Sequence, residues 1–471
     1  MMATRWTRSG VLSRRGLAML VLGILFGLVV LSVWSCRSAG SRTSGVLEPR
    51  DAAERLPVEP ASEADVRDEP LMRVRIRADA QEILLSSPGA WVVAPVGATT
   101  GDVVPGPARV VAGRDAVQVV GSDGKVRGFQ PGAHVYAARY TVSGRVDAVG
   151  VEGVSYPGTL RLVPSGGDRF DVISVVPIES YLPGVLSGEL FPHWHRSAFA
   201  VQAVAARSFA LTRREAARRA GRHYDVTDST RDQVYRGQTT LPVAHDAVRA
   251  TRGVVLVEDG RLAPAFYSST CGGRPALAED VWPDPASPRI ASASIDAAGI
   301  GSTRSGRAPL SGLTRETLCE AAPLYRWETL RDAGSLRRRV VEAAGARGIE
   351  SAAGFGGLRS IEPVAWNGAE RPTVYELVDV SGRSFRMTGE QLRTACNASV
   401  EGLRDVPRSA RVHSNDLAFE VGRRTVTIRG RGHGHGVGLC QFCAQGMAVR
   451  GDHWRRMLAA FYPDAEVRRV Y

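Results

Sequence analysis

The stretch IESYLPGVLSGELFPHWHRSAFAVQAVAARSFAL, residues 178–211, is the part of the chain that best indicates its fold. The run from Ser197 to Leu211 is rich in good helix formers, and its apolar residues recur near helical spacing. We therefore predict a helix over this run, with Pro192 in its approach or first turn. Glu189 then lies on the connection into a packed helix, where catalytic groups are often found. A surface or capping glutamate is the simpler interpretation.

Three further patterns follow along the chain: YDVTDSTRDQVYRG (224–237), FYSSTCGG (266–273) and GRGHGHGVGLCQFCAQGMA (430–448). Together with ESYLPGVLSGEL and QAVAARSFAL, they resemble the SpoIID/LytB family, named for the stage II sporulation protein D, over roughly residues 70–471. Sporulation members of that family are peptidoglycan lytic transglycosylases, whereas LytB-type members are described as enhancers of a wall amidase. The resemblance implies cell-wall glycan as the ligand.

The N-terminus carries a targeting signal. The apolar run Leu17–Trp34 is 18 residues long. It is preceded by four arginines: Arg5, Arg8, Arg14 and Arg15. That length is borderline for a membrane-spanning helix, and positive charge before the run predicts a C-terminus outside the cytoplasm. We predict an uncleaved signal anchor over residues 1–36, with a lipoprotein modified at Cys36 as the alternative; SRRG at 13–16 weakly resembles a twin-arginine signal. The rest of the chain is then extracytoplasmic, in the periplasm or at the cell-wall face.

The amino-acid composition limits the classes of binding partner that we predict. A hydrophobic content of 44% and a charged content of 23% are typical of a globular protein. The net charge is +12, and Lys125 is the only lysine. Because no basic run with interleaved aromatic residues occurs, nucleic acid is not predicted as a partner. A basic surface suits an anionic wall or membrane face, although it also simply favours solubility.

The chain divides by composition and pattern. Residues 37–70 are polar and poor in aromatics, which predicts a flexible linker. MRVRIRA alternates apolar and basic residues and opens a series of short predicted strands. We assign four further parts: a β-rich region at 71–150, a SpoIID-like catalytic core at 151–300, an inserted α+β subdomain at 301–405, and a C-terminal part of the core at 406–471 with a glycine-histidine loop. Strands and helices do not alternate as parallel units do, so the predicted fold class is α+β.

Local patterns within these parts give further expectations. Residues 283–312 are predicted to be loop, 314–347 helix, and 359–400 a β-region with a turn at SG in VYELVDVSGRSFRM. A hairpin turn is expected at the GG of RLVPSGGDRFDV. After the glycine-histidine loop, a final helix is predicted from about Gln441.

Glu189 is the predicted catalytic residue, because it matches the family's glutamate in the pattern G-V-L-x-x-E. Most glycosidases need two carboxyl groups, but in a lytic transglycosylase the C6 hydroxyl of the substrate attacks the anomeric carbon, and one carboxyl serves as acid and base. That acid needs a raised pKa. Apolar neighbours that would desolvate it are Leu186, Leu190, Phe191 and Trp194. The competing carboxylate, Glu179, is interpreted as structural because it precedes the apolar turn YLPGV.

Several residues are predicted to bind the glycan. Sugars are held by directional hydrogen bonds and by stacking on aromatic rings. The candidates are Gln233, Tyr235, Ser269, Thr270, His433, His435 and Gln441. Each has a structural alternative: a loop tied by its own polar groups for Gln233 and Tyr235, with Asp225 and Asp228 in either role, and a plain β-turn for SSTCGG. The histidines share one direction only in an extended segment, and sugar binding, orientation of Glu189 and metal ligation all remain open for them.

Five cysteines lie in the predicted exported part. CxxC at Cys440 and Cys443, with Cys271 and Cys319, provides a set of four ligands for a possible zinc ion, and His433 or His435 could substitute. Disulfides form readily in an exported protein and are the favoured use of these cysteines, ahead of zinc ligation, with buried free thiols as the third option. Some family members bind zinc through the STCGG cysteine and a downstream histidine, but residues 274–277 here include no histidine.

These observations lead to one function and two alternatives. We predict a membrane-anchored lytic transglycosylase that cleaves MurNAc-GlcNAc bonds, in glycan strands stripped of stem peptides as the resemblance suggests. The cofactor stays open, with zinc as the one candidate. The first alternative is a non-catalytic glycan-binding protein that recruits or activates a cell-wall amidase. The second is a zinc hydrolase of the wall, which requires metal-dependent turnover.

Overall fold

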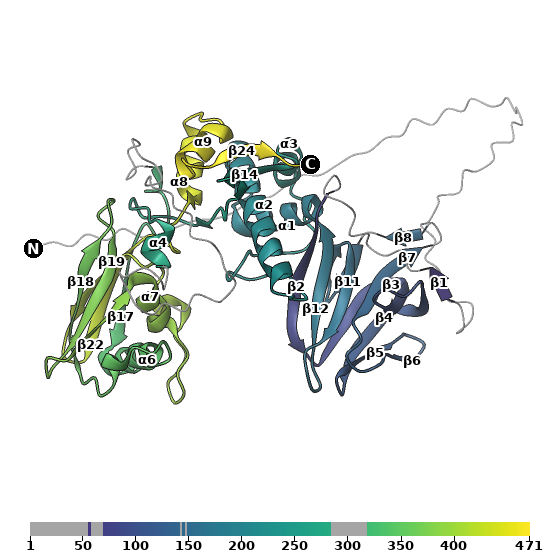
Figure 1. The fold of residues 1–471 in the computed structure, drawn as a ribbon, viewed down its shortest axis with the longest axis horizontal. Coiled ribbons are helices and arrows are strands. Elements are labelled where there is room, and N and C mark those ends of the chain that lie inside the picture. The colour runs from purple at the N-terminus through teal and green to yellow at the C-terminus, as the bar shows by residue number, and fades with distance from the viewer. Residues whose placement is uncertain (1–54, 58–68, 142–143, 147, 284–317) are drawn as a thin grey trace, which may run out of the picture. The chain divides into compact units, whose positions relative to one another are not determined.

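A computed structural model describes residues 55–57, 69–141, 144–146, 148–283 and 318–471 (Figure 1). The predicted anchor at 1–36, nearly all of the predicted loop at 283–312 and the start of the predicted helix at 314 lie outside these residues. Among the helices described, none combines the length and apolar character needed to cross a membrane. The mixed α+β class is confirmed, with a strand-rich N-terminal region.

One large sheet forms the N-terminal region, and its central order is β13-β2-β12-β11-β7-β3-β4-β5-β6 (Figure 1). Its strands are β1 (Arg55–Pro57), β2 (Leu71–Ala80), β3 (Glu82–Pro95), β4 (Thr100–Gly113), β5 (Ala116–Val120), β6 (Val126–Gly128), β7 (Val135–Thr141), β8 (Gly144–Val146), β9 (Ala148–Val151), β10 (Val154–Pro157), β11 (Thr159–Pro164), β12 (Phe170–Pro177) and β13 (Val226–Thr227). In β2 Met72, Val74 and Ile76 are buried and the arginines between them are not, which is the predicted alternation. The β11–β12 hairpin turns at Gly166 and Gly167, as expected.

Strand pairing crosses two of the boundaries predicted for this region. The division at 150/151 cuts through a continuous sheet, because β9 pairs with β10 and the sheet continues through β12. Within the predicted linker, Arg55–Pro57 pairs with β4. The end of that linker is also fixed, since Glu69 accepts hydrogen bonds from the backbone N–H of Glu179 and from Arg252. Backbone pairing offers hydrogen bonds that composition alone does not reveal.

Three helices follow the sheet: α1 (Ile178–Glu189), α2 (Arg196–Arg219) and α3 (Pro242–Ala250). Helix α1 corrects the expected turn at YLPGV. Pro183 lies inside it, and a proline there usually breaks a helix, but packing of its buried apolar face retains the helix. Helix α2 exceeds the predicted 197–211 at both ends, and Pro192 lies in the α1–α2 connection rather than in its first turn. His195 caps α2, accepting a 3.2 Å hydrogen bond from Ser197 N–H at Nδ1.

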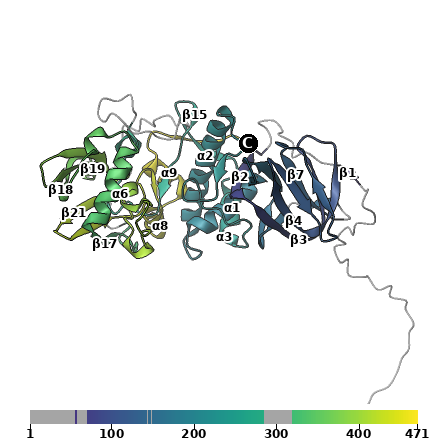
Figure 2. The same ribbon diagram turned by 90° about the horizontal axis from the view of Figure 1, so that it is seen from below.

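The C-terminal segment packs against α2. Its helices α8 (Gln441–Val449) and α9 (Trp454–Phe461) contact α2, and Figures 1 and 2 show both in yellow beside it. The start of α8 confirms the expected helix at Gln441. Short strands join the same part of the chain: β14 (Val254–Glu258) pairs with β15 (Arg261–Leu262) and β24 (Glu466–Arg469), while β16 (Tyr267–Ser268) pairs with β23 (Leu439–Cys440). Helix α4 spans Ala278–Val281.

A second hydrophobic core lies in the predicted insert. It is built by β17 (Arg326–Asp332), α6 (Ala333–Gly345), β18 (Leu358–Trp366), β19 (Pro372–Asp379), β20 (Ser384–Thr388), α7 (Gly389–Asn397), β21 (Leu417–Val421) and β22 (Thr425–Arg431), with 3-10 turns at Glu350–Ala352 and Arg408–Ala410. The insert therefore extends beyond the predicted end at 405, because β17 pairs with β22 and β22 with β21.

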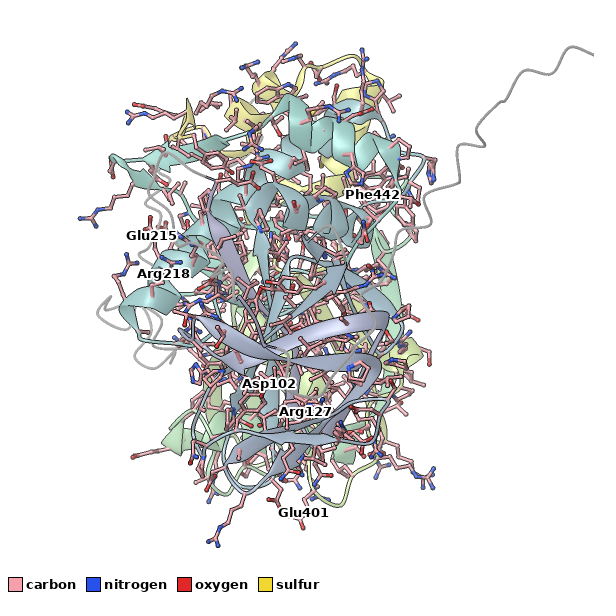
Figure 3. The ribbon with its side chains drawn as sticks, turned by 90° about the vertical axis from the view of Figure 1, so that its right-hand side faces the viewer. Asp102, Arg127, Glu215, Arg218, Glu401 and Phe442 are labelled. Atoms are coloured by element: carbon pink, nitrogen blue, oxygen red, sulfur yellow. The ribbon has the colours of Figure 1, made fainter. Side chains whose placement is uncertain are left out.

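Two predictions inside the insert need correction. Residues 326–332 form a strand rather than part of a helix, because RWETLRD alternates exposed and more buried side chains. The β-region predicted at 359–400 ends at 388, where Thr388 and Gln391 form a reciprocal capping box that starts α7. The SG turn between β19 and β20 is confirmed. Charged side chains project from the described surface, for example Glu215, Arg218 and Glu401 in Figure 3.

Candidate functional site

Glu189 is the last residue of α1, and its carboxyl group joins two distant segments. Oε1 accepts a 3.0 Å hydrogen bond from the backbone N–H of Val234. Oε2 accepts a 3.2 Å hydrogen bond from Nε2 of Gln441, at the start of α8. Glu189 as a residue is partly exposed. The C-terminal segment therefore completes the surroundings of the predicted acid.

The environment of Glu189 favours its neutral form. Burial raises its pKa, and the two hydrogen bonds and the positive charge of Arg236 only partly oppose that effect. A carboxylate at the C-terminal end of a helix also meets the negative end of the helix dipole. Of the four predicted apolar neighbours, Leu186, Leu190 and Trp194 are buried, whereas Phe191 is 48% exposed.

The side chain of Gln233 is not available to bind a ligand. It is fully buried, and its Oε1 accepts a 3.1 Å hydrogen bond from the Tyr181 hydroxyl. Its Nε2 donates to Ala206 O at 3.2 Å and to the Tyr267 hydroxyl at 3.1 Å. In this arrangement Gln233 ties down the loop that presents Val234 N–H to Glu189, as the structural alternative for this residue expects.

Tyr235 is also part of the core rather than a platform for sugar stacking. It is 4% exposed, and its ring packs against Tyr181 at 4.7 Å and Tyr156 at 5.7 Å between centroids. A Cβ on Gly184 would lie 2.7 Å from the same ring. The absence of a side chain at Gly184 thus allows α1 to approach the loop closely.

In the SSTCGG segment one predicted contact, Thr270, is buried, and the other, Ser269, is partly exposed. Thr270 is 1% exposed, forms a β-bridge with His433, and accepts a hydrogen bond from Gly272 N–H, so it is not placed to bind sugar directly. Ser269 is partly exposed, and its carbonyl accepts a 3.1 Å hydrogen bond from Phe442 N–H. Of the two predicted contacts, only Ser269 remains available for a ligand.

The two loop histidines have separate surroundings. Gly432, Gly434 and Gly436 have positive φ, so the segment is not extended and the two rings do not share one direction. The exposed His433 ring packs against His413 at 5.5 Å. His435 lies against Trp282 at 5.0 Å, its Nδ1 accepts from Val437 N–H, and burial lowers its pKa to about 4. Among the predicted loop residues, Gln441 is the one whose side chain bonds Glu189.

Next to Glu189 lies an aromatic cluster that the sequence patterns do not predict: Phe191, Trp194 and Phe442. Phe191 packs on Trp194 at 5.4 Å and on Phe442 at 6.2 Å, and Trp194 and Phe442 meet edge-on at 4.9 Å. Phe442, labelled in Figure 3, follows Gln441 directly. The FxxW spacing was visible in the sequence, but its partner on α8 lies about 250 residues away.

The other acidic candidates have structural partners. Glu179 forms a two-point ion pair with the fully buried Arg207, at 2.9 and 2.7 Å, which agrees with the structural interpretation. Asp225 pairs in the same way with Arg73, at 3.0 and 2.6 Å. Asp228 is partly exposed, lies 4.0 Å from Arg77, and has a pKa raised by burial.

Four cysteines from distant parts of the chain meet in the core. The sulfur atoms of Cys271, Cys319, Cys440 and Cys443 lie within 4.8 Å of one another, and all four residues are buried. None of the described cysteines forms a disulfide. This is the predicted set of four, and the loop histidines stay outside it. Four protein ligands fill a tetrahedral site, whereas a catalytic zinc keeps one position open, so this cluster does not suit the zinc-hydrolase alternative.

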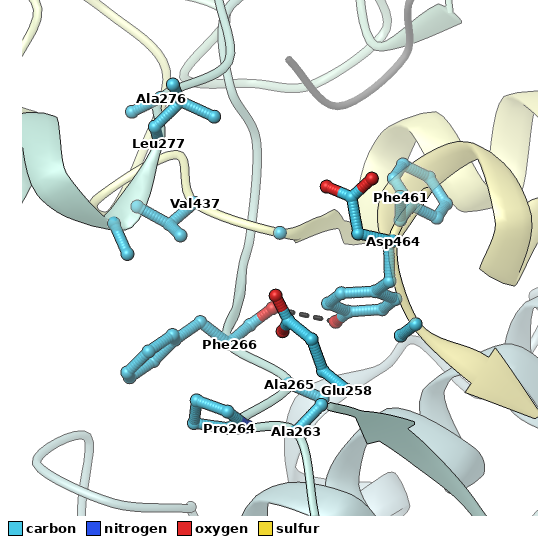
Figure 4. Close-up of a pocket in the computed structure, with 14 residues that line it drawn as sticks. Glu258, Ala263, Pro264, Ala265, Phe266, Ala276, Leu277, Val437, Phe461 and Asp464 are labelled. Carbon is cyan, nitrogen blue, oxygen red and sulfur yellow. Dashed lines mark hydrogen bonds between the residues drawn. The ribbon is translucent and has the colours of Figure 1, made fainter. Parts of the chain in front are cut away.

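A small apolar pocket lies elsewhere on the core (Figure 4). Phe266, Val437, Phe461 and Glu258 are among its lining residues, and the Tyr462 hydroxyl donates a 2.7 Å hydrogen bond to Phe266 O. Its volume is about 40 Å³. Because that volume is too small for a sugar ring and the lining does not include Glu189, we do not assign the glycan site to it.

The fold and the site define an α+β protein with one partly buried carboxyl at the end of a helix. Residues 166–257, which include Glu189 and the loop that holds it, match the family described as Stage II sporulation protein, SpoIID. This match supports the resemblance to the SpoIID/LytB family that the motifs indicate.

Two curated relatives extend this comparison. An amidase enhancer of Bacillus subtilis is 26% identical over 287 residues, covering 60% of this chain and 39% of that protein. An uncharacterised protein of Brachyspira hyodysenteriae is 33% identical over 138 residues, covering 29% of this chain and 37% of that protein. The chain thus spans less than two fifths of the length of each relative.

Proposed function

We propose that this protein is a cell-wall enzyme, a lytic transglycosylase that cleaves peptidoglycan glycan strands. The observation that carries the proposal is the setting of Glu189, a partly exposed residue whose carboxyl has a raised pKa and is held by Val234 and Gln441. The match of residues 166–257 to the SpoIID family supports the substrate class. The exposed Phe191 offers a ring on which a sugar can stack.

The proposed reaction needs one carboxyl group. Protonated Glu189 donates its proton to the glycosidic oxygen as the bond to the MurNAc anomeric carbon breaks. The C6 hydroxyl of the same sugar then attacks that carbon, and the Glu189 carboxylate accepts the hydroxyl proton. The products are a free hydroxyl on the released GlcNAc and a 1,6-anhydro ring on MurNAc, and no water is consumed. A raised pKa supplies the protonated starting state.

Mass spectrometry of the products tests this proposal. The full chain is incubated with glycan strands stripped of stem peptides, beside Glu189→Gln and the matched control Glu258→Gln, a second partly buried carboxyl with a raised pKa. We expect 1,6-anhydro ends from the native protein and the control, and at least about a 100-fold loss in Glu189→Gln. Intact strands with native protein still bound to them would overturn the enzyme proposal.

The second candidate is a glycan-binding protein that activates a cell-wall amidase. It is favoured by the similarity to the amidase enhancer over 60% of this chain. In that case the protein raises the rate of a wall amidase on intact peptidoglycan, and Glu189→Gln retains the effect. Adding the native chain or the variant to a purified amidase, and measuring the release of stem peptides, separates the two candidates.

We further propose that the protein acts outside the cytoplasm, held by the apolar segment near its N-terminus. The charge asymmetry around residues 17–34 supports this location. Protease added to intact spheroplasts should digest the C-terminal part while a cytoplasmic marker survives. Protection of the C-terminal part would contradict the proposed location.

A further inference from the structure

We propose that Cys271, Cys319, Cys440 and Cys443 bind one structural zinc ion. Four buried sulfur atoms within 4.8 Å of one another are the ligand set and the compactness that such a site needs. The proposal does not depend on the proposed function, because a structural ion serves a glycan-binding protein as well as an enzyme.

The distances between the sulfur atoms fit a metal better than disulfides. Cys271 Sγ lies 3.8 Å from Cys443 Sγ and 3.9 Å from Cys319 Sγ. Zinc–sulfur bonds of about 2.3 Å in a tetrahedron place the sulfur atoms about 3.8 Å apart. A disulfide needs a separation of about 2.0 Å, and it would join only two of the four.

Backbone groups around Cys440 hold its sulfur atom in place. Its sulfur accepts backbone N–H bonds from Cys271 at 3.3 Å and from Cys443 at 3.4 Å. It also caps α8, a nine-residue helix, so the positive end of the helix dipole is directed at the sulfur atom. Metal-bound sulfur atoms are commonly held by such outer hydrogen bonds.

The ion would connect three segments of the chain. Cys271 follows β16, Cys319 precedes β17, and the CxxC pair opens α8; along the sequence, Cys271 is 48 residues from Cys319 and 172 from Cys443. Closing such long loops through one ion stabilises the folded chain by restricting the unfolded one. Because Gln441 lies between two of the ligands, the same ion would fix the side chain that bonds Glu189.

Metal analysis tests the proposal directly. The full chain is purified from membranes without added metal, and its metal content is measured by mass spectrometry. We expect about one zinc ion per chain. The variant Cys440→Ser/Cys443→Ser should fall below about a tenth of that content. Cys396→Ser is the matched control, because Cys396 is also buried and free but lies in the second core, and it should retain the ion.

A second measurement covers the case in which the double variant fails to fold. The native protein is titrated with an organomercurial reagent while a metal-sensitive dye reports released zinc. Release that follows modification of four thiols, the number in the cluster, supports the site. Native protein that contains no metal, contains iron in place of zinc, or holds these cysteines as disulfides would overturn the proposal.

Discussion

The side-chain amide of Gln441 donates a hydrogen bond to Oε2 of Glu189 from 252 residues further along the chain. It is the contact by which the C-terminal segment reaches the predicted acid. The contact stabilises the ionised carboxylate and so acts against the burial that raises the pKa of Glu189. Gln441 is therefore a positioning residue that also adjusts the acidity of Glu189.

Replacing Gln441 should change the pH dependence of glycan cleavage. In Gln441→Leu the carboxylate loses a donor, so the pKa of Glu189 rises further and more of the acid stays protonated at high pH. We expect the alkaline limb of the pH–rate profile to move to higher pH, while the rate on the acidic side changes by less than about tenfold.

The control for this change lies one turn further along α8. Gln445 accepts a hydrogen bond from His195 N–H and, among the described residues, is not hydrogen-bonded to Glu189. Gln445→Leu should leave the alkaline limb in place. Equal shifts in both variants would mean that the helix, rather than the Gln441 amide, sets the acidity of Glu189.

The raised pKa of Glu189 should also affect the stability of the folded protein. Because the pKa of Glu189 is raised in the folded state, its contribution to stability is complete below the ordinary value of 4.5 and is lost as the pH rises through the folded-state pKa. The glutamine in Glu189→Gln cannot ionise, so the variant does not lose this stability as the pH rises. We expect the variant to melt at a higher temperature than the native chain at pH 7, and the difference to shrink toward pH 4. A difference independent of pH would contradict the raised pKa.

The sequence motifs identify the site, but they do not show how its residues pack. The helix from Ser197, the strands with alternating burial and the four cysteines follow from local patterns. Gln233 and Tyr235 look like ligand-binding groups in a loop, and only the fold shows that Tyr181, Tyr267 and Tyr156 surround them.

Helix α1 was missed for a similar reason. Pro183 indicates a turn in any local window, and the apolar contacts that retain the helix come from other elements. Likewise, the contact of Phe442 with Trp194 depends on α8 returning to the α1–α2 connection. Long-range contacts of this kind have no signature in the spacing of a single sequence.

Phe191 should contribute to glycan binding. Its exposed ring stands two residues after Glu189 and is supported by Trp194 and Phe442. We expect Phe191→Ala to weaken binding to glycan strands about 3- to 10-fold, as the loss of one aromatic contact of about 1 kcal/mol predicts. Sedimentation with insoluble peptidoglycan measures the affinity. Trp366→Ala, which removes a ring that is 56% exposed in the inserted subdomain, should change nothing; equal losses would indicate unspecific binding.

The buried ion pair of Glu179 and Arg207 should matter for stability rather than for chemistry. Glu179 also accepts hydrogen bonds from Tyr471 OH at 2.6 Å and from Gly253 N–H at 3.2 Å. Glu179→Leu leaves a buried guanidinium unpaired, which should cost about 3–5 kcal/mol in urea unfolding. Adding Arg207→Met should cost less than the sum of the two single changes. Additive losses would show that the pair is not coupled.

Gly184 should control the approach of α1 to the loop that holds Glu189. A Cβ there would lie 2.1 Å from the Gly237 carbonyl oxygen, which is backbone and cannot rotate away. Gly184→Ala must therefore displace the loop or the helix, at a cost of about 1–3 kcal/mol in urea unfolding, and the Val234 N–H bond to Glu189 would be disturbed with it. Glycan cleavage should fall more than stability alone explains.

The matched control for this substitution is Gly345→Ala, at the last position of α6. A Cβ at Gly345 meets no atom within 4 Å, so alanine fits there without displacement. We expect stability and cleavage equal to or above those of the native chain, because alanine is the better helix former. If Gly184→Ala were as well tolerated as Gly345→Ala, then the close contact between α1 and the loop would not be what positions Val234 against the acid.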